Sequence, residues 1–225
     1  MSGKAGYTTP EPERSVLLTI DVQEDFVRRG APAEIHGTAE RIPAMRRAVD
    51  AYRKHCLSIV HVVRLYLADG SNADLCRRES IESGTRIVVP GTTGAELIEE
   101  LRPAPACRLD VESLLPGGLQ QWTEHEWVMY KPRWDAFYRT PLEEHLRELR
   151  TTTVVVAGCN FPNCPRATVY GASMRDFRVV LLSDAVSCAD ELGLAELRGI
   201  GVTTMPSEPY LATLSVALGR ANRPS

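Results

Sequence analysis

Three side chains that could together carry out acyl transfer occur far apart in the chain: Asp21, Lys131 and Cys164. Each comes at or just after the end of an apolar run that predicts a buried strand, at 16–20, 127–130 and 154–157. A thiol can attack a carbonyl, a carboxylate can accept the thiol proton, and an ammonium can stabilise both charged groups. Because parallel strands end at one edge of a sheet, we expect the three side chains to meet there.

Cys164 is the candidate nucleophile because of its position. Pro165 suits a first helical position and the helical pattern continues to Met174, so Cys164 is expected at a helix N-terminus. The helix dipole and the unpaired N–H groups there favour an anion, which predicts a lowered pKa for the thiol. Cys159, on the same loop, is interpreted as a small buried residue that ends the strand. A redox pair of Cys159 with Cys164 is an alternative.

The other polar residues at strand ends also have simpler interpretations. An aspartate such as Asp21 often caps a turn or a helix, and a lysine is usually a solvated surface charge. Pro132 nevertheless disfavours a helical conformation for Lys131, which places Lys131 at the end of an extended segment. His61 lies within the apolar run 57–63 and is expected to be a hydrogen-bonded core residue rather than a ligand.

Predicted strands and predicted helices, which would position these residues, alternate along the chain. Apolar runs predict strands at 16–20, 57–63, 127–130, 154–157, 178–182 and 202–205. Helical patterns occur at 38–55, 74–82, 94–101, 140–150, 164–174, 190–198 and 207–220. We therefore expect an α/β fold with one domain at 15–225, preceded by a flexible N-terminal arm at 1–14.

Composition excludes several classes of partner. The 225 residues carry a net charge of −3, which argues against binding to nucleic acid or to an anionic membrane. No apolar run is long enough to span a bilayer, and the N-terminal residues lack the apolar core of a signal peptide. We expect a cytoplasmic protein with reduced thiols that acts on a small molecule. No glycine-rich phosphate loop provides a site for NAD or ATP.

The segment 64–93 is long, rich in turn-forming residues and weakly periodic, which is typical of a lid or a binding loop. We expect it to contribute to substrate selection. Aromatic and polar residues that follow the predicted strands are candidates for the wall of a substrate pocket: Gln23, Phe26, Arg64, Tyr66, Trp134, Phe137 and Tyr138.

The three segments around the candidate residues resemble the motifs of the isochorismatase-like cysteine hydrolases. They read IDVQEDF with Asp21, YKPRWDAF with Lys131, and VVVAGCNFPNCPRATVYGASMRDFRVVLLSDAVS with Cys164. The resemblance extends from Val16 to about Val202 and is specific in the order and spacing of the motifs. That superfamily contains nicotinamidases, N-carbamoylsarcosine and ureidoacrylate amidohydrolases, and streptothricin hydrolases.

The resemblance implies a fold and a mechanism. The fold would be a Rossmann-like, three-layer α/β/α arrangement with a mostly parallel six-stranded sheet, in a homodimer or homotetramer. The activity would be hydrolysis of a carbon–nitrogen bond by an Asp–Lys–Cys triad. It also implies a cis peptide bond between Cys159 and Asn160, with the backbone N–H groups of Asn160 and Cys164 forming an oxyanion hole.

Departures from the family pattern narrow the expected activity. Nicotinamidases of the family have an Asp-x-His metal motif after the second strand, where this chain reads VVRLYLAD. No metal and no cofactor are therefore expected, and nicotinamide is a less favoured substrate. True isochorismatases cleave a vinyl ether without a cysteine nucleophile, so Cys164 favours amide chemistry over that alternative. A small-molecule binder or scaffold protein with an idle triad is the alternative from another class.

Overall fold

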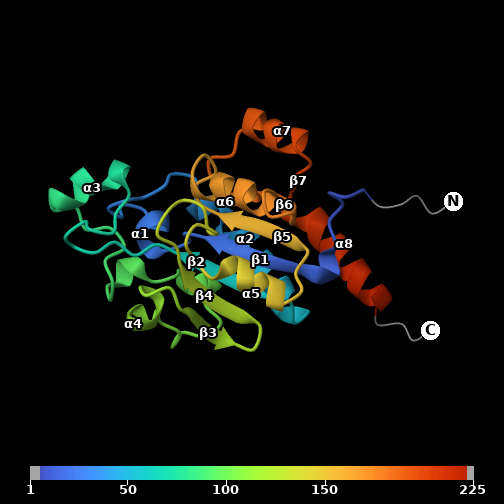
Figure 1. Cartoon of the computed structure of the whole chain (residues 1–225), viewed down its shortest axis with the longest axis horizontal. Helices are drawn as coiled ribbons and strands as arrows, with labels where there is room; N and C mark the ends of the chain where they lie inside the picture. The colour runs from blue at the N-terminus through green and yellow to red at the C-terminus, as the bar shows by residue number, and fades with distance from the viewer. Residues whose placement is uncertain (1–5, 222–225) are drawn as a thin grey trace.

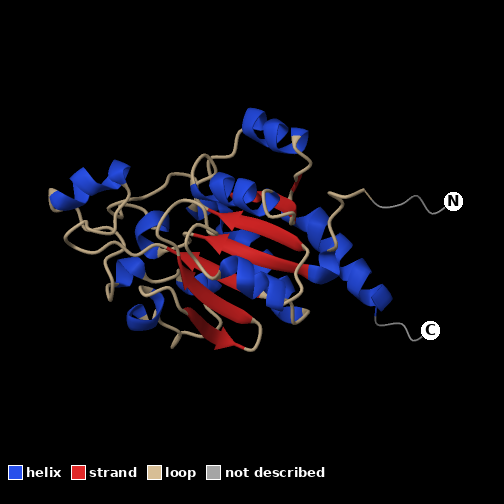
Figure 2. Ribbon diagram, in the orientation of Figure 1, coloured by secondary structure: helices blue, strands red, loops and turns tan. Residues whose placement is uncertain are grey.

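A seven-stranded sheet forms the centre of the protein and helices cover both of its faces (Figure 1 and Figure 2). The computed structural model describes residues 6–221. The strand order is β3-β4-β2-β1-β5-β6-β7, and every pair of neighbours is parallel except β3 and β4. The strands are β1 (Ser15–Ile20), β2 (Ile59–Val63), β3 (Leu119–Thr123), β4 (Glu126–Tyr130), β5 (Thr153–Gly158), β6 (Arg178–Val186) and β7 (Thr203–Met205).

The six strands expected from apolar runs are confirmed, and so is the α/β/α fold class. The strand count is corrected from six to seven, because β3 also joins the sheet. β3 pairs antiparallel to β4 at the edge of the sheet and its residues, LQQWT, are partly exposed. An edge strand with two glutamines has no continuous apolar run to reveal it.

The helices connect successive strands and cover the two faces of the sheet. They are α1 (Glu24–Val27), α2 (Ile42–Lys54), α3 (Leu75–Glu82), α4 (Val111–Leu114), α5 (Leu142–Glu148), α6 (Cys164–Ser173), α7 (Glu191–Gly199) and α8 (Ser207–Ala221). The short helical turn predicted at 94–101 is present as two 3-10 turns, Thr93–Ala95 and Glu99–Leu101. None of the helices within residues 6–221 has both the length and the apolar composition of a membrane span.

Alternating residues of the central strands supply the two halves of the core. On β1, Leu18 faces a cluster that includes Val169 of α6, whereas Leu17 faces a cluster that includes Met45 of α2. Burial on both faces explains why the central strands read as uninterrupted apolar runs rather than as an alternating pattern. A third cluster lies beneath the segment 64–93 and includes Ile81 of α3.

In the predicted N-terminal arm, residues 6–9 are exposed, whereas Glu11 and Pro12 lie against the body of the protein. The backbone N–H of Glu11 donates to the hydroxyl of Thr153 at 2.9 Å, and the Glu11 carboxylate pairs with Arg178 at 2.9 Å. Residues 1–5 lie outside the described residues.

His61 is a hydrogen-bonded core residue, as expected. It is fully buried on β2, and its ring lies 2.6 Å from the Thr19 hydroxyl and 2.7 Å from the Glu126 carboxylate. Arg53 of α2 also donates to both carboxylate oxygens of Glu126, at 2.6 and 2.9 Å. Burial by itself would raise the pKa of Glu126, but hydrogen bonds from His61 and Arg53 outweigh it and lower that pKa to about 2.

Glu126→Gln is expected to lower the free energy of unfolding at pH 7 by about 2–4 kcal/mol, because it removes the charge that His61 and Arg53 stabilise. The folded-state pKa is depressed, so this contribution is complete above about pH 4.5 and is lost as the pH falls toward 2. Urea unfolding at several pH values should show the difference between variant and wild type shrinking on acidification. Glu124→Gln, at an exposed carboxylate nearby, is the control, and equal effects of both variants would contradict this account.

Candidate active site

Asp21 and Lys131 meet at the carboxyl edge of the sheet because of the strand order. Asp21 follows β1 and its backbone N–H donates to Val62 at 2.8 Å, while the N–H of Lys131 after β4 donates to Val63 at 3.0 Å. β2 lies between these two strands, and the long lysine side chain reaches past it. Lys131 Nζ donates to Asp21 Oδ2 at 2.8 Å. Lys131 is 0% exposed and Asp21 is 4% exposed, so the ion pair lies inside the protein.

The loop after β5 brings Cys164 to the same edge. β5 ends at Gly158, where φ is +124° and an added Cβ would lie 2.2 Å from the Ile20 carbonyl oxygen. Only glycine tolerates this close approach of β5 to β1. The following peptide bond, Cys159–Asn160, is cis, as the family resemblance implies. The chain then turns into α6, whose first residue is Cys164, so the predicted position at a helix N-terminus is confirmed.

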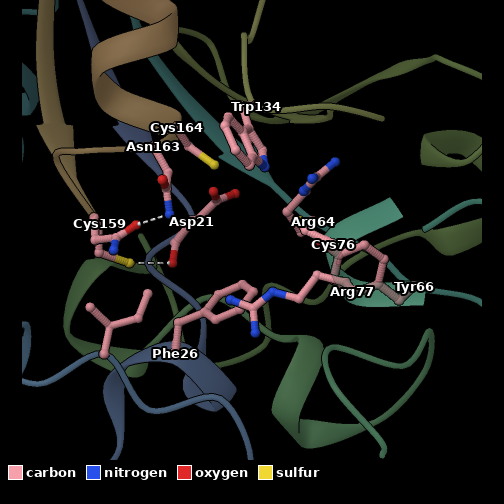
Figure 3. Close-up of a pocket in the computed structure, with 12 residues that line it drawn as sticks. Asp21, Phe26, Arg64, Tyr66, Cys76, Arg77, Trp134, Cys159, Asn163 and Cys164 are labelled. Carbon is pink, nitrogen blue, oxygen red and sulfur yellow. Dashed lines mark hydrogen bonds between the residues drawn. The ribbon is translucent and has the colours of Figure 1, made fainter. Parts of the chain in front are cut away.

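A cavity of about 330 Å³ opens beside these side chains (Figure 3). This volume lies at the lower end of the range for small-molecule sites. The residues that line it come from the loops after β1, β2, β4 and β5 and from α1, α3 and the start of α6: Asp21, Phe26, Ile35, Arg64, Tyr66, Cys76, Arg77, Trp134, Cys159, Asn160, Asn163 and Cys164. Asp21 and Cys164 therefore both face one small-molecule cavity.

Burial reverses the pKa shift expected for Cys164. Burial and, after it, the neighbouring Asp21 carboxylate raise the pKa of the Cys164 thiol to about 12, although Lys131 and Arg64 act in the opposite direction. The prediction of a lowered pKa was wrong because it left out burial of the thiol and the charge of Asp21. At neutral pH the resting site therefore holds a thiol beside a carboxylate.

The Asp21 carboxylate is arranged to receive that proton. Oδ2 is bonded to Lys131, whereas Oδ1 is buried and has no hydrogen-bond partner among residues 6–221. In Figure 3 the carboxylate points toward the sulfur of Cys164. A buried carboxylate oxygen without a partner is costly, and such atoms are concentrated at functional sites.

Two backbone N–H groups are available at the cavity wall. Those of Asn160 and Cys164 donate no hydrogen bond to any residue in the described range 6–221. Cys164 is the first residue of α6, where an N–H group has no partner within the helix. This arrangement suits the negative oxygen of a tetrahedral intermediate.

Four of the seven pocket candidates lie at the cavity wall. Phe26, Arg64, Tyr66 and Trp134 line the cavity. Tyr138 instead lines a neighbouring open groove, which it shares with Trp134.

Gln23 and Phe137 do not line the cavity, so these two predictions were wrong. The Gln23 side chain is buried and bonds the backbone N–H and carbonyl of Arg64, both at 2.7 Å. Phe137 packs in the core and stacks on Phe177 with ring centroids 5.9 Å apart. Neighbours in sequence point in different directions at a loop, and the sequence pattern does not specify which of them face the cavity.

Cavity residues that were not predicted come mainly from long loops. Cys76 and Arg77 lie on α3, Ile35 on the loop after α1, and Asn163 just before α6. The available signal was the length of the segment 64–93, which predicted a binding loop without identifying its contacts. Within residues 6–221, no three His, Cys, Asp or Glu side chains form a group that could hold a metal ion.

Cys159 does not have the setting of a redox partner. It is 1% exposed, and its S–H group donates to the backbone carbonyl of Asp21 at 3.0 Å. Burial also raises the pKa of its thiol. We therefore interpret Cys159 as a buried residue that supports the Asp21 backbone.

Comparison with known proteins shows which family the chain resembles. The model of the Isochorismatase domain family matches residues 15–111 and 115–208 of this chain. A solved structure of an isochorismatase family protein from Desulfovibrio vulgaris is similar, with a TM-score of 0.75 and 32% sequence identity over 92% of this chain and 99% of that chain.

The names of two curated relatives differ in whether they describe an active enzyme. A protein of Arabidopsis thaliana named "Probable inactive nicotinamidase" is 30% identical over 84% of this chain and 91% of its own length. A ureidoacrylate amidohydrolase of Methylobacterium radiotolerans is 26% identical over 78% of this chain and 67% of its own length.

Asp21→Asn should change alkylation of Cys164 and hydrolysis in opposite directions. Without the carboxylate charge, the Cys164 pKa should fall toward the value favoured by Lys131 and Arg64, and alkylation at pH 7 should accelerate about tenfold for each pKa unit. A hydrolysis that uses Asp21 as the proton acceptor should collapse in the same variant. Iodoacetamide labelling followed by peptide mass analysis measures the Cys164 rate directly. Slower or unchanged labelling of a folded variant would contradict the assigned electrostatics.

Proposed function

The chain belongs to the isochorismatase domain family, and on that premise we propose that it is a cysteine-dependent hydrolase of a carbon–nitrogen bond in a small molecule. The substrate bond would be an amide, a ureido or carbamoyl group, or a lactam. The observation that carries the proposal is the 2.8 Å contact between Lys131 and Asp21 at a cavity that Cys164 also lines. A nucleophile, a proton acceptor and a cation are thus present at one site.

In the first step, the Cys164 sulfur attacks the substrate carbonyl carbon and its proton passes to Asp21 Oδ1. The negative oxygen that forms is stabilised by the N–H groups of Asn160 and Cys164. Collapse of the tetrahedral intermediate breaks the carbon–nitrogen bond, and the leaving nitrogen takes the proton from Asp21. A thioester on Cys164 remains.

In the second step, water attacks the thioester carbonyl while Asp21 accepts a proton from that water. The carbon–sulfur bond then breaks, the product leaves as an acid, and the proton returns to the sulfur. Lys131 keeps Oδ2 of Asp21 occupied, so proton transfer takes place at Oδ1.

The names of relatives support this class of reaction. A relative at 26% identity is a ureidoacrylate amidohydrolase, and another at 24% identity is an N-carbamoylsarcosine amidase. We extend amidohydrolase chemistry to this chain on that basis. The proposal also includes a cytoplasmic location and a homodimer or homotetramer, with no nucleic-acid or membrane partner.

Ligand binding without hydrolysis is the second candidate function. It is favoured by the Arabidopsis relative, whose name describes it as inactive at 30% identity. The triad side chains are all present here, so the two candidates differ in turnover and not in the presence of a site.

Release of ammonia or of a ring-opened acid from a panel of primary amides, carbamoyl, ureido and lactam compounds tests the proposed function. Cys164→Ala should lower turnover by about 10⁴-fold or more, because the attacking atom is removed. Its melting temperature should stay near that of wild type. Cys56→Ala, at an exposed cysteine, is the matched control and should keep full activity.

Mass analysis of quenched reactions should show an acyl group on Cys164 in the wild type. Equal turnover by a folded Cys164→Ala variant would overturn the proposed mechanism. Saturable binding of panel compounds without turnover would favour the second candidate.

A further inference from the structure

Two guanidinium groups line the cavity, and one of them is already compensated within the protein. Arg64 is 2% exposed, its guanidinium is paired with Asp74, and it donates to the Lys131 carbonyl at 3.1 Å. The Tyr66 hydroxyl also donates to Asp74, at 2.8 Å. The hydrogen-bonding capacity and the charge of Arg64 are thus largely used by its neighbours.

Arg77 has a different environment. It lies on α3, three residues after Asp74, and is half-buried at the cavity wall. Within residues 6–221, no carboxylate oxygen lies within 4.0 Å of its guanidinium nitrogens, and that guanidinium donates no hydrogen bond. Figure 3 shows its side chain extending to the Phe26 side of the cavity, with Cys164 on the other side.

The charges around the cavity leave an excess of one positive charge. Lys131 neutralises Asp21, and Asp74 neutralises Arg64. Arg77 is the remaining charged residue of the lining, because its other members are uncharged, including the Cys164 thiol at neutral pH. Phe26 and Trp134 form apolar parts of the wall, which strengthens the attraction of a cation for an anion inside the cavity.

We infer that the substrate carries a carboxylate, which Arg77 binds while the scissile carbonyl lies against Cys164. The inference rests on the proposed hydrolase function and specifies its substrate class: small amides, ureides or lactams with one carboxylate. A planar guanidinium offers two parallel N–H groups that match the two oxygens of a carboxylate. The pairing of Arg64 with Asp74, the residue before α3, holds the beginning of the helix from which Arg77 extends.

Substrate pairs in which a neutral methylamide replaces the carboxylate test the inference. Suitable probes are N-carbamoylglycine with its methylamide, and succinamate with N-methylsuccinamide. Arg77→Gln should raise KM for the two carboxylates about 10- to 100-fold, the loss expected for one charge-assisted contact, with a much smaller change in kcat. Kinetics with the two uncharged compounds should be unchanged.

Arg77→Lys should recover part of the loss, because lysine keeps the charge but not the planar pair of donors. Arg86→Gln, an exposed arginine beyond the end of α3, is the matched control and should behave as wild type. A wild type that prefers the uncharged compounds, or an Arg77→Gln variant that changes both members of a pair alike, would overturn the carboxylate site and leave the hydrolase proposal standing.

Calorimetric binding of N-carbamoylglycine and succinamate to Cys164→Ala protein gives a readout that does not need turnover. Binding that is lost in the Cys164→Ala/Arg77→Gln double variant supports the carboxylate site, even if the wild type hydrolyses none of the four compounds. In that case the hydrolase proposal fails and the anion site remains. Absence of binding to Cys164→Ala, or binding that does not depend on Arg77, overturns the inference.

Discussion

The buried ion pair between Lys131 and Asp21 is the interaction on which the site depends. A lysine ammonium with no exposure to solvent costs several kcal/mol unless an opposite charge compensates it, and here the compensation comes from Asp21 at 2.8 Å. Because Lys131 occupies Oδ2, only Oδ1 of Asp21 is left for chemistry. The order β4-β2-β1 makes this pairing possible, because only β2 separates the end of β4 from the end of β1. Sheet topology therefore brings Lys131 to Asp21 and leaves Oδ1 without a lysine contact.

Burial also decides the state of the nucleophile. A helix N-terminus favours a thiolate, but removing the thiol from water beside a carboxylate favours the protonated form, and the second effect is larger at Cys164. In the proposed mechanism the proton therefore stays on sulfur until a substrate arrives, and attack is coupled to transfer of that proton to Asp21. Turnover by this mechanism requires exact placement of the substrate carbonyl as well as the three side chains. Membership in the family therefore does not by itself determine turnover.

In the proposed function, selectivity and chemistry come from different parts of the chain. The triad follows central strands, whereas Cys76 and Arg77 come from α3 in the long segment after β2. Arg64 and Asp74 connect the two parts, because their ion pair fixes the beginning of α3 relative to the sheet edge. Changes in this segment can alter the charge of the cavity without disturbing the strands that hold the ion pair.

The sequence by itself determined the fold class and six of the seven strands, because a strand buried on both faces needs a continuous apolar run. It also determined the convergence of Asp21 and Lys131 at the cavity of Cys164, because the carboxyl ends of parallel strands meet at one edge of the sheet. It did not reveal β3, whose edge position leaves its residues partly exposed. Only the tertiary structure decided the protonation of Cys164, the inward burial of Gln23 and Phe137, and the uncompensated charge of Arg77. Each of these depends on which distant groups surround a side chain, and neither spacing nor periodicity along the chain records those surroundings.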